Sequence, residues 1–323
     1  MASSVFVRTI LIDAGRFALS PWALRALGLF IFGLILVRVD LGSVAETIAN
    51  ARPVLVVGAL VLTVPFFIAK SYRWRVILHR YEIEISTGQA LRIYCAGLFA
   101  GQATPGQLGE VVRARFLSTR GHDSVKSVAS VVVDRALDLV ALVLIAIPGF
   151  GLVFGAGAAL ALLSALLVMS IALVLMRPRR VLRAIAGKLG QRAQGVAGRV
   201  DELFESLDRL MRTPRDISVL VLTTMGALGI NMLRFYLLLA SLGLSLPIVD
   251  FVFGVALANL LALLPVTIFG VGTRDAVLAL VFLQAGGTTE GAVAFSLLIL
   301  AVAYLLNMVV GSIAWALETG RTK

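Results

Sequence analysis

Long apolar runs, separated by short polar segments, follow one another along most of this 323-residue chain. Each run approaches the ~20 residues that one helix needs to cross a bilayer. The pattern therefore predicts an all-α integral membrane protein, a single polytopic domain over residues 1–323 with about eight membrane segments. We expect these segments near residues 22–37, 53–69, 87–103, 127–147, 150–176, 217–242, 251–267 and 292–317.

Two of these runs are interrupted in the same way. Residues 97–117 read GLFAGQATPGQLGEVVRARFL, and residues 257–283 read LANLLALLPVTIFGVGTRDAVLALVFL. In each, an apolar run meets a proline, glycine-spaced turn residues, and an acidic residue near an arginine. Identical residues follow the two breaks at one constant spacing: Leu117 and Leu283, Gly121 and Gly287, Ser130 and Ser296. Such paired interruptions in two halves of a membrane protein are typical of a transporter site.

The distribution of basic residues predicts the orientation. Residues 177–215 carry ten Arg and Lys against four acids, so we expect a cytoplasmic, partly amphipathic linker there. Lys70, Arg73 and their basic neighbours up to residue 80 predict a second cytoplasmic loop, and both termini are expected in the cytoplasm.

A full crossing by residues 87–103 would place the basic residues 113–120 outside, so we expect this segment to be re-entrant. Three crossings then separate the two broken segments, which gives the two halves opposite orientations. The sequence thus predicts an inverted-topology repeat, with a first repeat at 53–176 and a second at 216–318.

Composition narrows the function classes. The mean hydropathy of +0.99 and a hydrophobic content of 59% leave too much apolar surface for a soluble domain. The net charge of +11 fits basic loops at anionic lipid heads better than nucleic acid. One cysteine, Cys95, excludes an internal disulfide, and two histidines argue against a His-based metal site. We see no ATP-binding, dinucleotide or hydrolase motif and expect no cofactor.

The breaks carry the first candidate site residues. Proline removes a backbone donor and glycine permits redirection, so such a break inside a membrane persists only within protein or beside a water-filled cavity. A helix that begins near Gly109 would offer free N–H groups to an anion. Packing kinks are the alternative interpretation. The residues concerned are Pro105, Gly106 and Gly109 in the first break, and Pro265, Gly270 and Gly272 in the second.

Charged residues in apolar segments are the second group, because buried charges usually face a cavity or one another. Glu110 and Arg113 share one helix face, and they could pair with the D-R-x-x-D residues of the 127–147 helix across the break. The alternatives are interface anchoring for Arg113 and Arg115, and a purely structural cluster. The remaining candidates are Asp134, Arg135, Asp138, Arg274 and Asp275, with the polar positions Gln102, Asn231, Arg234 and Asn259. Arg234 is a candidate phosphate partner, whereas Asn259, Tyr304 and Asn307, taken individually, fit interhelical hydrogen bonding better than ligand contact.

The run TPGQLGEVVRARFLSTRG, followed by SVASVVVDRALDLVAL, resembles the membrane domain of lysylphosphatidylglycerol synthase/flippases. That family has a P-G-x-x-G-E-x-x-R run before an E/D-R-x-x-D helix. The segment LPVTIFGVGTRDAVL is similar to a later family run, although Phe269 replaces a glycine and Asp275 stands where Glu is usual. The chain ends at Lys323, so the resemblance implies the lipid-translocating half without the aminoacyltransferase domain. The family motifs map onto the residues of both breaks and of the D-R-x-x-D helix named above.

We therefore expect a non-enzymatic flippase in the cytoplasmic membrane. Its substrate would be an anionic or modified lipid, either a phospholipid or a polyprenyl-phosphate-linked lipid. A separate lipid-modifying enzyme and a second copy of the chain are further candidate partners. Two alternatives stay open. The protein could be a membrane-embedded headgroup transferase with Glu110 or Asp134 as base or nucleophile, or a membrane scaffold for a separate enzyme.

Overall fold

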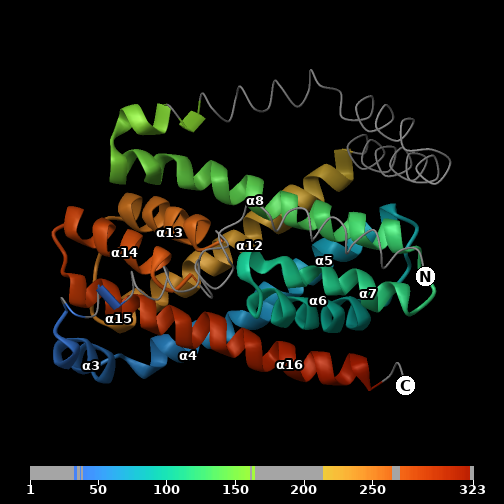
Figure 1. Cartoon of the computed structure of the whole chain (residues 1–323), viewed down its shortest axis with the longest axis horizontal. Coiled ribbons are helices and arrows are strands. Elements are labelled where there is room, and N and C mark those ends of the chain that lie inside the picture. Colours follow the sequence, from blue (N-terminus) through green and yellow to red (C-terminus); the bar gives the residue numbers. More distant parts are fainter. Residues whose placement is uncertain are drawn as a thin grey trace, which may run out of the picture.

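The computed structural model describes residues 39–160, 214–263 and 270–320, together with positions 33, 34, 37, 162 and 163. Every regular element within these ranges is a helix, which confirms the all-α prediction for them (Figure 1). Three stretches lie outside the described residues: most of the predicted 22–37 segment, most of the later part of 150–176, and nearly all of the 177–215 linker.

Four described helices are long and apolar enough to cross a membrane. Pro53–Arg80 comprises α4 (Pro53–Val61) and α5 (Thr63–Arg80), and Thr289–Thr319 comprises α15 (Thr289–Ile299), the π-helix η4 (Leu300–Leu305) and α16 (Leu306–Thr319). The other two are α8 (Ser124–Phe154) and α12 (Pro214–Ser241). Three of them contain a predicted segment in full, and α12 ends one residue before the predicted 217–242 segment does.

Two of these helices run further than the sequence pattern predicted. Residues 70–80, expected in a loop, form the second half of α5, whose buried side chains continue through Trp74, Ile77 and Leu78. α8 continues past the expected end at residue 147 through Pro148, which is tolerated inside a membrane helix where neighbouring groups compensate for the lost donor. At Gly149 a Cβ would lie 2.1 Å from the carbonyl oxygen of Phe253, so helix packing requires glycine at this crossing.

The first broken segment is a helical hairpin. Its first arm, α6 (Thr87–Gln102), begins with a capping box in which Ser86 and Gln89 satisfy each other's backbone donors. The 3-10 helix η2 (Pro105–Val111) starts at Pro105 and leads into α7 (Val112–Ser118). The regular α-helix thus begins at Val112 rather than near Gly109. The Gly109 amide instead donates to Thr104 Oγ1 at 2.7 Å, which stabilises the turn.

The second broken segment also has an α-helix on each side of its break. A π-helix, η3 (Asp250–Gly254), continues into α13 (Val255–Ala262), and α14 (Thr273–Gln284) follows the break. Gly270 and Gly272 have positive φ angles of 74° and 95°, a backbone conformation that glycine adopts without steric cost. Pro265 lies outside the described residues.

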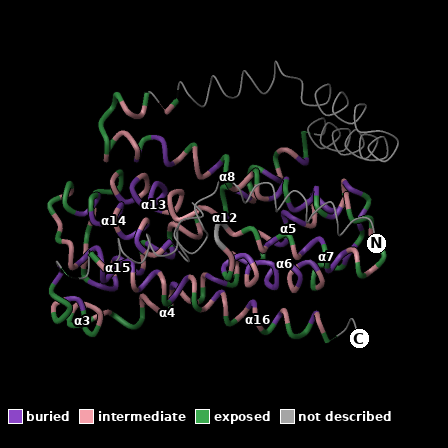
Figure 2. The backbone as a smooth tube through the Cα atoms, in the orientation of Figure 1, coloured by how far each residue is buried: buried purple, intermediate pink, exposed green. Residues whose placement is uncertain are grey.

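Two hydrophobic cores lie at opposite ends of the long helices (Figures 1 and 2). One joins α6 and α7 to parts of α5, α8 and α16. The other joins α13, α14 and α15 to α3 (Leu41–Ala49) and the end of α12. Each hairpin also packs on a long helix from the other half of the chain, since α6 contacts α16 and α13 contacts α8.

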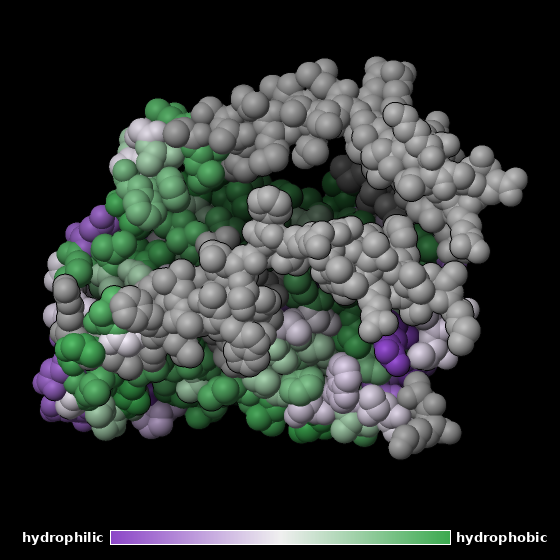
Figure 3. Space-filling model, viewed as in Figure 1, coloured by the Kyte–Doolittle hydropathy of each residue, from purple (hydrophilic) through white to green (hydrophobic). Residues whose placement is uncertain are grey.

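The outer surface is rich in apolar side chains (Figure 3). Exposed residues recur along single helix faces, for example Val54, Val57 and Val61 on α4, or Val132 and Leu139 on α8. Exposed apolar stripes of this length are favourable where lipid is the solvent. The charged residues described next lie inside the molecule.

Candidate functional site

Two glycines of α6 make room for the charged side chains of the first break. A Cβ at Gly97 would lie 2.3 Å from Cγ of Arg113, and one at Gly101 would lie 2.5 Å from Cγ of Glu110. Gly109 brings the two arms together, because its Cβ would lie 2.1 Å from the Ala100 carbonyl oxygen. The side chains of Glu110 and Arg113 therefore pack directly against the glycines of α6.

These side chains enter a buried ion-pair network with α8. Arg113 donates to Glu110 Oε2 and to Asp134 Oδ2, both at 2.9 Å. Arg135 lies 2.6 Å from Glu110 Oε1 and 3.6 Å from Asp138. The predicted pairing across the break is thus present. Arg113 is fully buried, so the interface-anchor alternative does not hold for this residue, whereas Arg115 is exposed.

α5 contributes two cations that the sequence pattern had assigned to a loop. Arg73 donates to Asp134 Oδ1 through Nη2 at 2.6 Å, to Asp138 Oδ1 at 2.7 Å and to Thr224 Oγ1 at 2.9 Å. Lys70 forms an ion pair with Asp138. The apolar spacing of Phe67, Trp74 and Ile77 was the available signal, because it continues the helix past these charges.

Aromatic rings close the network on one side. The Arg113 guanidinium carbon lies 4.6 Å from the Tyr94 ring centroid and 5.0 Å from that of Trp74. Cation–π contacts of this geometry stabilise a desolvated guanidinium. Four cations, Lys70, Arg73, Arg113 and Arg135, thus meet three carboxylates, Glu110, Asp134 and Asp138.

The charged residues of the second break form a separate buried cluster. Asp275 accepts a hydrogen bond from the Gly272 amide at 2.7 Å and so caps α14. Ser296 accepts from Arg274 Nε at 3.0 Å and donates to Asp275. The Arg274 guanidinium lies 5.1 Å from the Tyr304 ring centroid. Tyr304 also lines the cavity described next, and is therefore the point at which this cluster approaches it.

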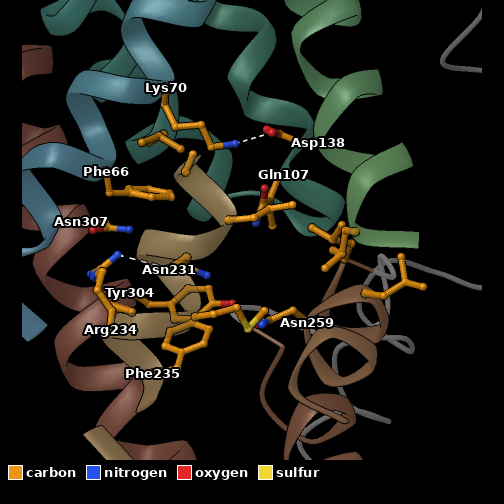
Figure 4. Close-up of a pocket in the computed structure, with 18 of the residues that line it drawn as sticks. Phe66, Lys70, Gln107, Asp138, Asn231, Arg234, Phe235, Asn259, Tyr304 and Asn307 are labelled. Carbon is orange, nitrogen blue, oxygen red and sulfur yellow. Dashed lines mark hydrogen bonds and ion pairs between the residues drawn. The ribbon is translucent and has the colours of Figure 1, made fainter. Parts of the chain in front are cut away.

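A cavity of about 610 Å³ lies between the two cores (Figure 4). Residues of α5, α6, η2, α8, α12, α13, η4 and α16 line it. Lys70 and Asp138 lie at one end, and Arg234 with Asn231 lies toward the other, with Phe66 between them (Figure 4). Six predicted site residues line the cavity: Gln102, Arg135, Asp138, Asn231, Arg234 and Asn259.

Arg234 is the most unusual of these lining residues. It is 1% exposed, and its contacts are the Ala59 carbonyl oxygen at 3.3 Å, Asn231 Oδ1 at 3.4 Å and the Phe66 ring. Within the described ranges no carboxylate pairs with it, and its Nη2 has no hydrogen-bond partner there. A buried cation without a counterion is costly, so the site favours an anionic ligand.

Gln107 is a lining residue that the sequence analysis treated only as part of the turn. Its φ angle of 57° is rare for a residue other than glycine, and its side chain accepts a hydrogen bond from Arg135 at 2.9 Å. This contact couples the break directly to the charge network. Among the described residues, no group of three or more His, Cys, Asp or Glu side chains could hold a metal ion.

One comparison with known proteins matches most of the chain. A family profile described as "Lysylphosphatidylglycerol synthase TM region" matches residues 21–311. A search of curated proteins found no match.

Proposed function

Because this chain belongs to the lysylphosphatidylglycerol synthase transmembrane-region family, we propose that it translocates a lipid with an anionic headgroup across the cytoplasmic membrane. The family and the apolar helices make it an integral membrane protein with a lipid-related role. The observation that carries the proposal is Arg234, a buried guanidinium at the wall of a cavity, which no described carboxylate pairs.

The charge of the cavity supports an anionic ligand. Lys70, Arg135 and Arg234 are the cations among its described lining residues, and Asp138 is the one carboxylate, which leaves a formal charge of +2. Guanidinium groups bind phosphate oxygens in a planar, two-pronged geometry. The phosphate of a lipid headgroup would therefore neutralise the positive charge that the single carboxylate of the lining does not balance. The hydrocarbon chains of that lipid would stay in the bilayer.

The arrangement of the hairpins supports transport. α6 and α7 belong to one core and α13 and α14 to the other, and each first arm packs on a long helix of the opposite half. We propose that the two hairpins are re-entrant from opposite sides of the membrane, in an inverted repeat with both termini cytoplasmic. Relative movement of two such halves around a central site is the usual basis of alternating access.

Translocation is preferred over headgroup transfer because the candidate bases are engaged. Glu110 pairs with Arg113 and Arg135, and Asp134 pairs with Arg73 and Arg113. A carboxylate held between two guanidinium groups is a poor proton acceptor and nucleophile. A scaffold role alone would leave the cavity residues tolerant of substitution.

The test compares Arg234→Gln with Arg115→Gln in proteoliposomes. The readout is movement of fluorescent phosphatidylglycerol, followed by dithionite quenching of the outer leaflet. We expect Arg234→Gln to slow movement about tenfold or more, because a hydrogen bond to a charged group contributes about 1.5–3 kcal/mol. Arg115 is exposed, so its variant should match the wild type.

Equal rates for wild type and Arg234→Gln, in folded protein, would refute the headgroup role of this residue. Lipid turnover by purified protein with an activated donor, without translocation, would favour the transferase instead. Thermal unfolding of each variant before reconstitution separates loss of function from loss of fold.

A further inference from the structure

We infer that the cavity recognises a headgroup with several hydroxyls, a sugar or polyol joined to the lipid through a phosphate. This inference rests on the proposed function and specifies the substrate class of the same site. Five carboxamide side chains line the cavity, each from a different helix: Gln102, Gln107, Asn231, Asn259 and Asn307. Figure 4 labels Gln107, Asn231, Asn259 and Asn307 around this cavity.

Two of the carboxamides have unsatisfied buried atoms. Gln102 is 8% exposed and Asn307 is 7% exposed, and within the described part of the chain neither Gln102 Oε1 nor Asn307 Oδ1 has a hydrogen-bond partner. Arg234 Nη2 also lacks a hydrogen-bond partner within the described part of the chain. Arg135 Nε, on another lining residue, is also unpartnered within the described ranges. Buried polar groups in folded proteins are nearly always hydrogen-bonded, so four such atoms on residues that line one cavity indicate groups that a ligand completes.

Hydroxyls fit this set better than the other headgroup chemistries. A carboxamide has an NH2 group that donates and an oxygen that accepts. A hydroxyl can hydrogen-bond to either of them, in both orientations of the amide. An ammonium group only donates, and the positive lining repels it. A bare phosphate only accepts, so it would satisfy Arg234 but leave the carboxamide oxygens unpaired.

The size of the space is consistent with this class. A volume of about 610 Å³ lies well inside the range of small-molecule sites, roughly 300–1,000 Å³, and exceeds what a phosphate alone would fill. The arrangement therefore provides a phosphate position at Arg234 and additional amides, in the same cavity, for the rest of the headgroup.

The experiment compares two lipids that differ in headgroup hydroxyls but not in charge. Purified full-length protein is given phosphatidylinositol and phosphatidylpropanol of identical acyl chains, both singly charged phosphodiesters, and native mass spectrometry measures the affinity for each. We expect the wild type to prefer phosphatidylinositol about tenfold or more, the change that one or two net hydrogen bonds produce.

Variants assign the preference to the carboxamides. The double variant Gln102→Met/Asn307→Leu keeps side-chain volume and should reduce the preference to about twofold or less, with phosphatidylpropanol affinity unchanged. Arg234→Gln should weaken both lipids to a similar extent and keep the preference. Gln284→Met, at an exposed position of α14 outside the cavity, is the matched control and should behave as the wild type.

Different results would overturn the hydroxyl inference and the proposed anionic site. If the wild type binds the two lipids equally and Arg234→Gln binds neither, the hydroxyl inference is overturned and the anionic site is supported. A preference that survives in the double variant would also overturn it. If neither lipid binds with higher affinity than neutral phosphatidylcholine, and Arg234→Gln changes neither affinity, the anionic site itself is refuted. The wild-type comparison needs no variant, so the inference remains testable even if a variant does not fold.

Discussion

Neutralising Asp134 is the most direct test of the buried network. Its two oxygens accept hydrogen bonds from Arg73 Nε at 2.9 Å, from Arg73 Nη2 at 2.6 Å and from Arg113 Nη1 at 2.9 Å. The Asp134→Asn variant has nearly the same volume, but one acceptor oxygen becomes an NH2 group that faces guanidinium donors. The variant therefore changes charge and hydrogen bonding with little change in packing.

The expected destabilisation is about 3–5 kcal/mol, the effect of removing one partner from a buried ion pair. At least one charge-assisted hydrogen bond, worth about 1.5–3 kcal/mol, disappears, and the remaining loss comes from two guanidinium groups left with less countercharge. Asp138 still pairs with Arg73, and Glu110 still pairs with Arg113, so the network is weakened rather than abolished.

The assay is reversible unfolding in mixed detergent and SDS micelles, followed by far-UV circular dichroism. Glu84→Gln is the matched control, because its pair with His79 is 66–70% exposed and such pairs contribute about 0–1 kcal/mol. A loss below about 1 kcal/mol for Asp134→Asn, close to that control, would refute the view that this network holds α5, α7 and α8 together.

Two further substitutions test the packing of the breaks. Gly109→Ala should destabilise the protein by about 1–3 kcal/mol in the same assay, because its Cβ would lie 2.1 Å from the Ala100 carbonyl oxygen. Gly226→Ala, which meets nothing within 4 Å, should be neutral or stabilising, and equal effects of the two would contradict the close approach at Gly109. Ser296→Ala should cost about 1–3 kcal/mol, because it removes the hydroxyl between Arg274 and Asp275. Ser218→Ala, at an exposed position, should change stability by less than about 0.5 kcal/mol, and a Ser296→Ala effect of that size would show that the second cluster tolerates its loss.

The helical architecture was largely readable from the sequence because lipid imposes simple length and polarity rules on spanning helices. The ends of helices were less predictable. The segment was expected to end at residue 69, before Lys70, although apolar positions continue to Leu78. A charge inside a helix is tolerated when its partner lies across the interface, and that partner, Asp138, is far away in the sequence. Local pattern alone therefore could not extend α5.

The site was predictable where charge neutralisation dictated it. Arg113 was a candidate partner for the D-R-x-x-D residues because an isolated charge at membrane depth is costly, and the structure pairs it with Asp134. The cavity was not predictable, since its lining comes from eight elements spread along the chain. The two breaks also differ more than their sequences indicated, because Asp275 is used as a helix cap whereas Glu110 joins the network.

The contact between α6 and α16 has a consequence for how the protein is made. A Cβ at Gly311 would lie 2.7 Å from the Cys95 carbonyl oxygen, so the two backbones touch although more than two hundred residues separate them. During synthesis α6 emerges from the ribosome long before its packing partner exists. The face of α6 that carries Cys95 and Phe99 therefore lacks this helix partner until α16 has been synthesised. A chain stalled before residue 306 would contain the first hairpin without the helix that covers this face.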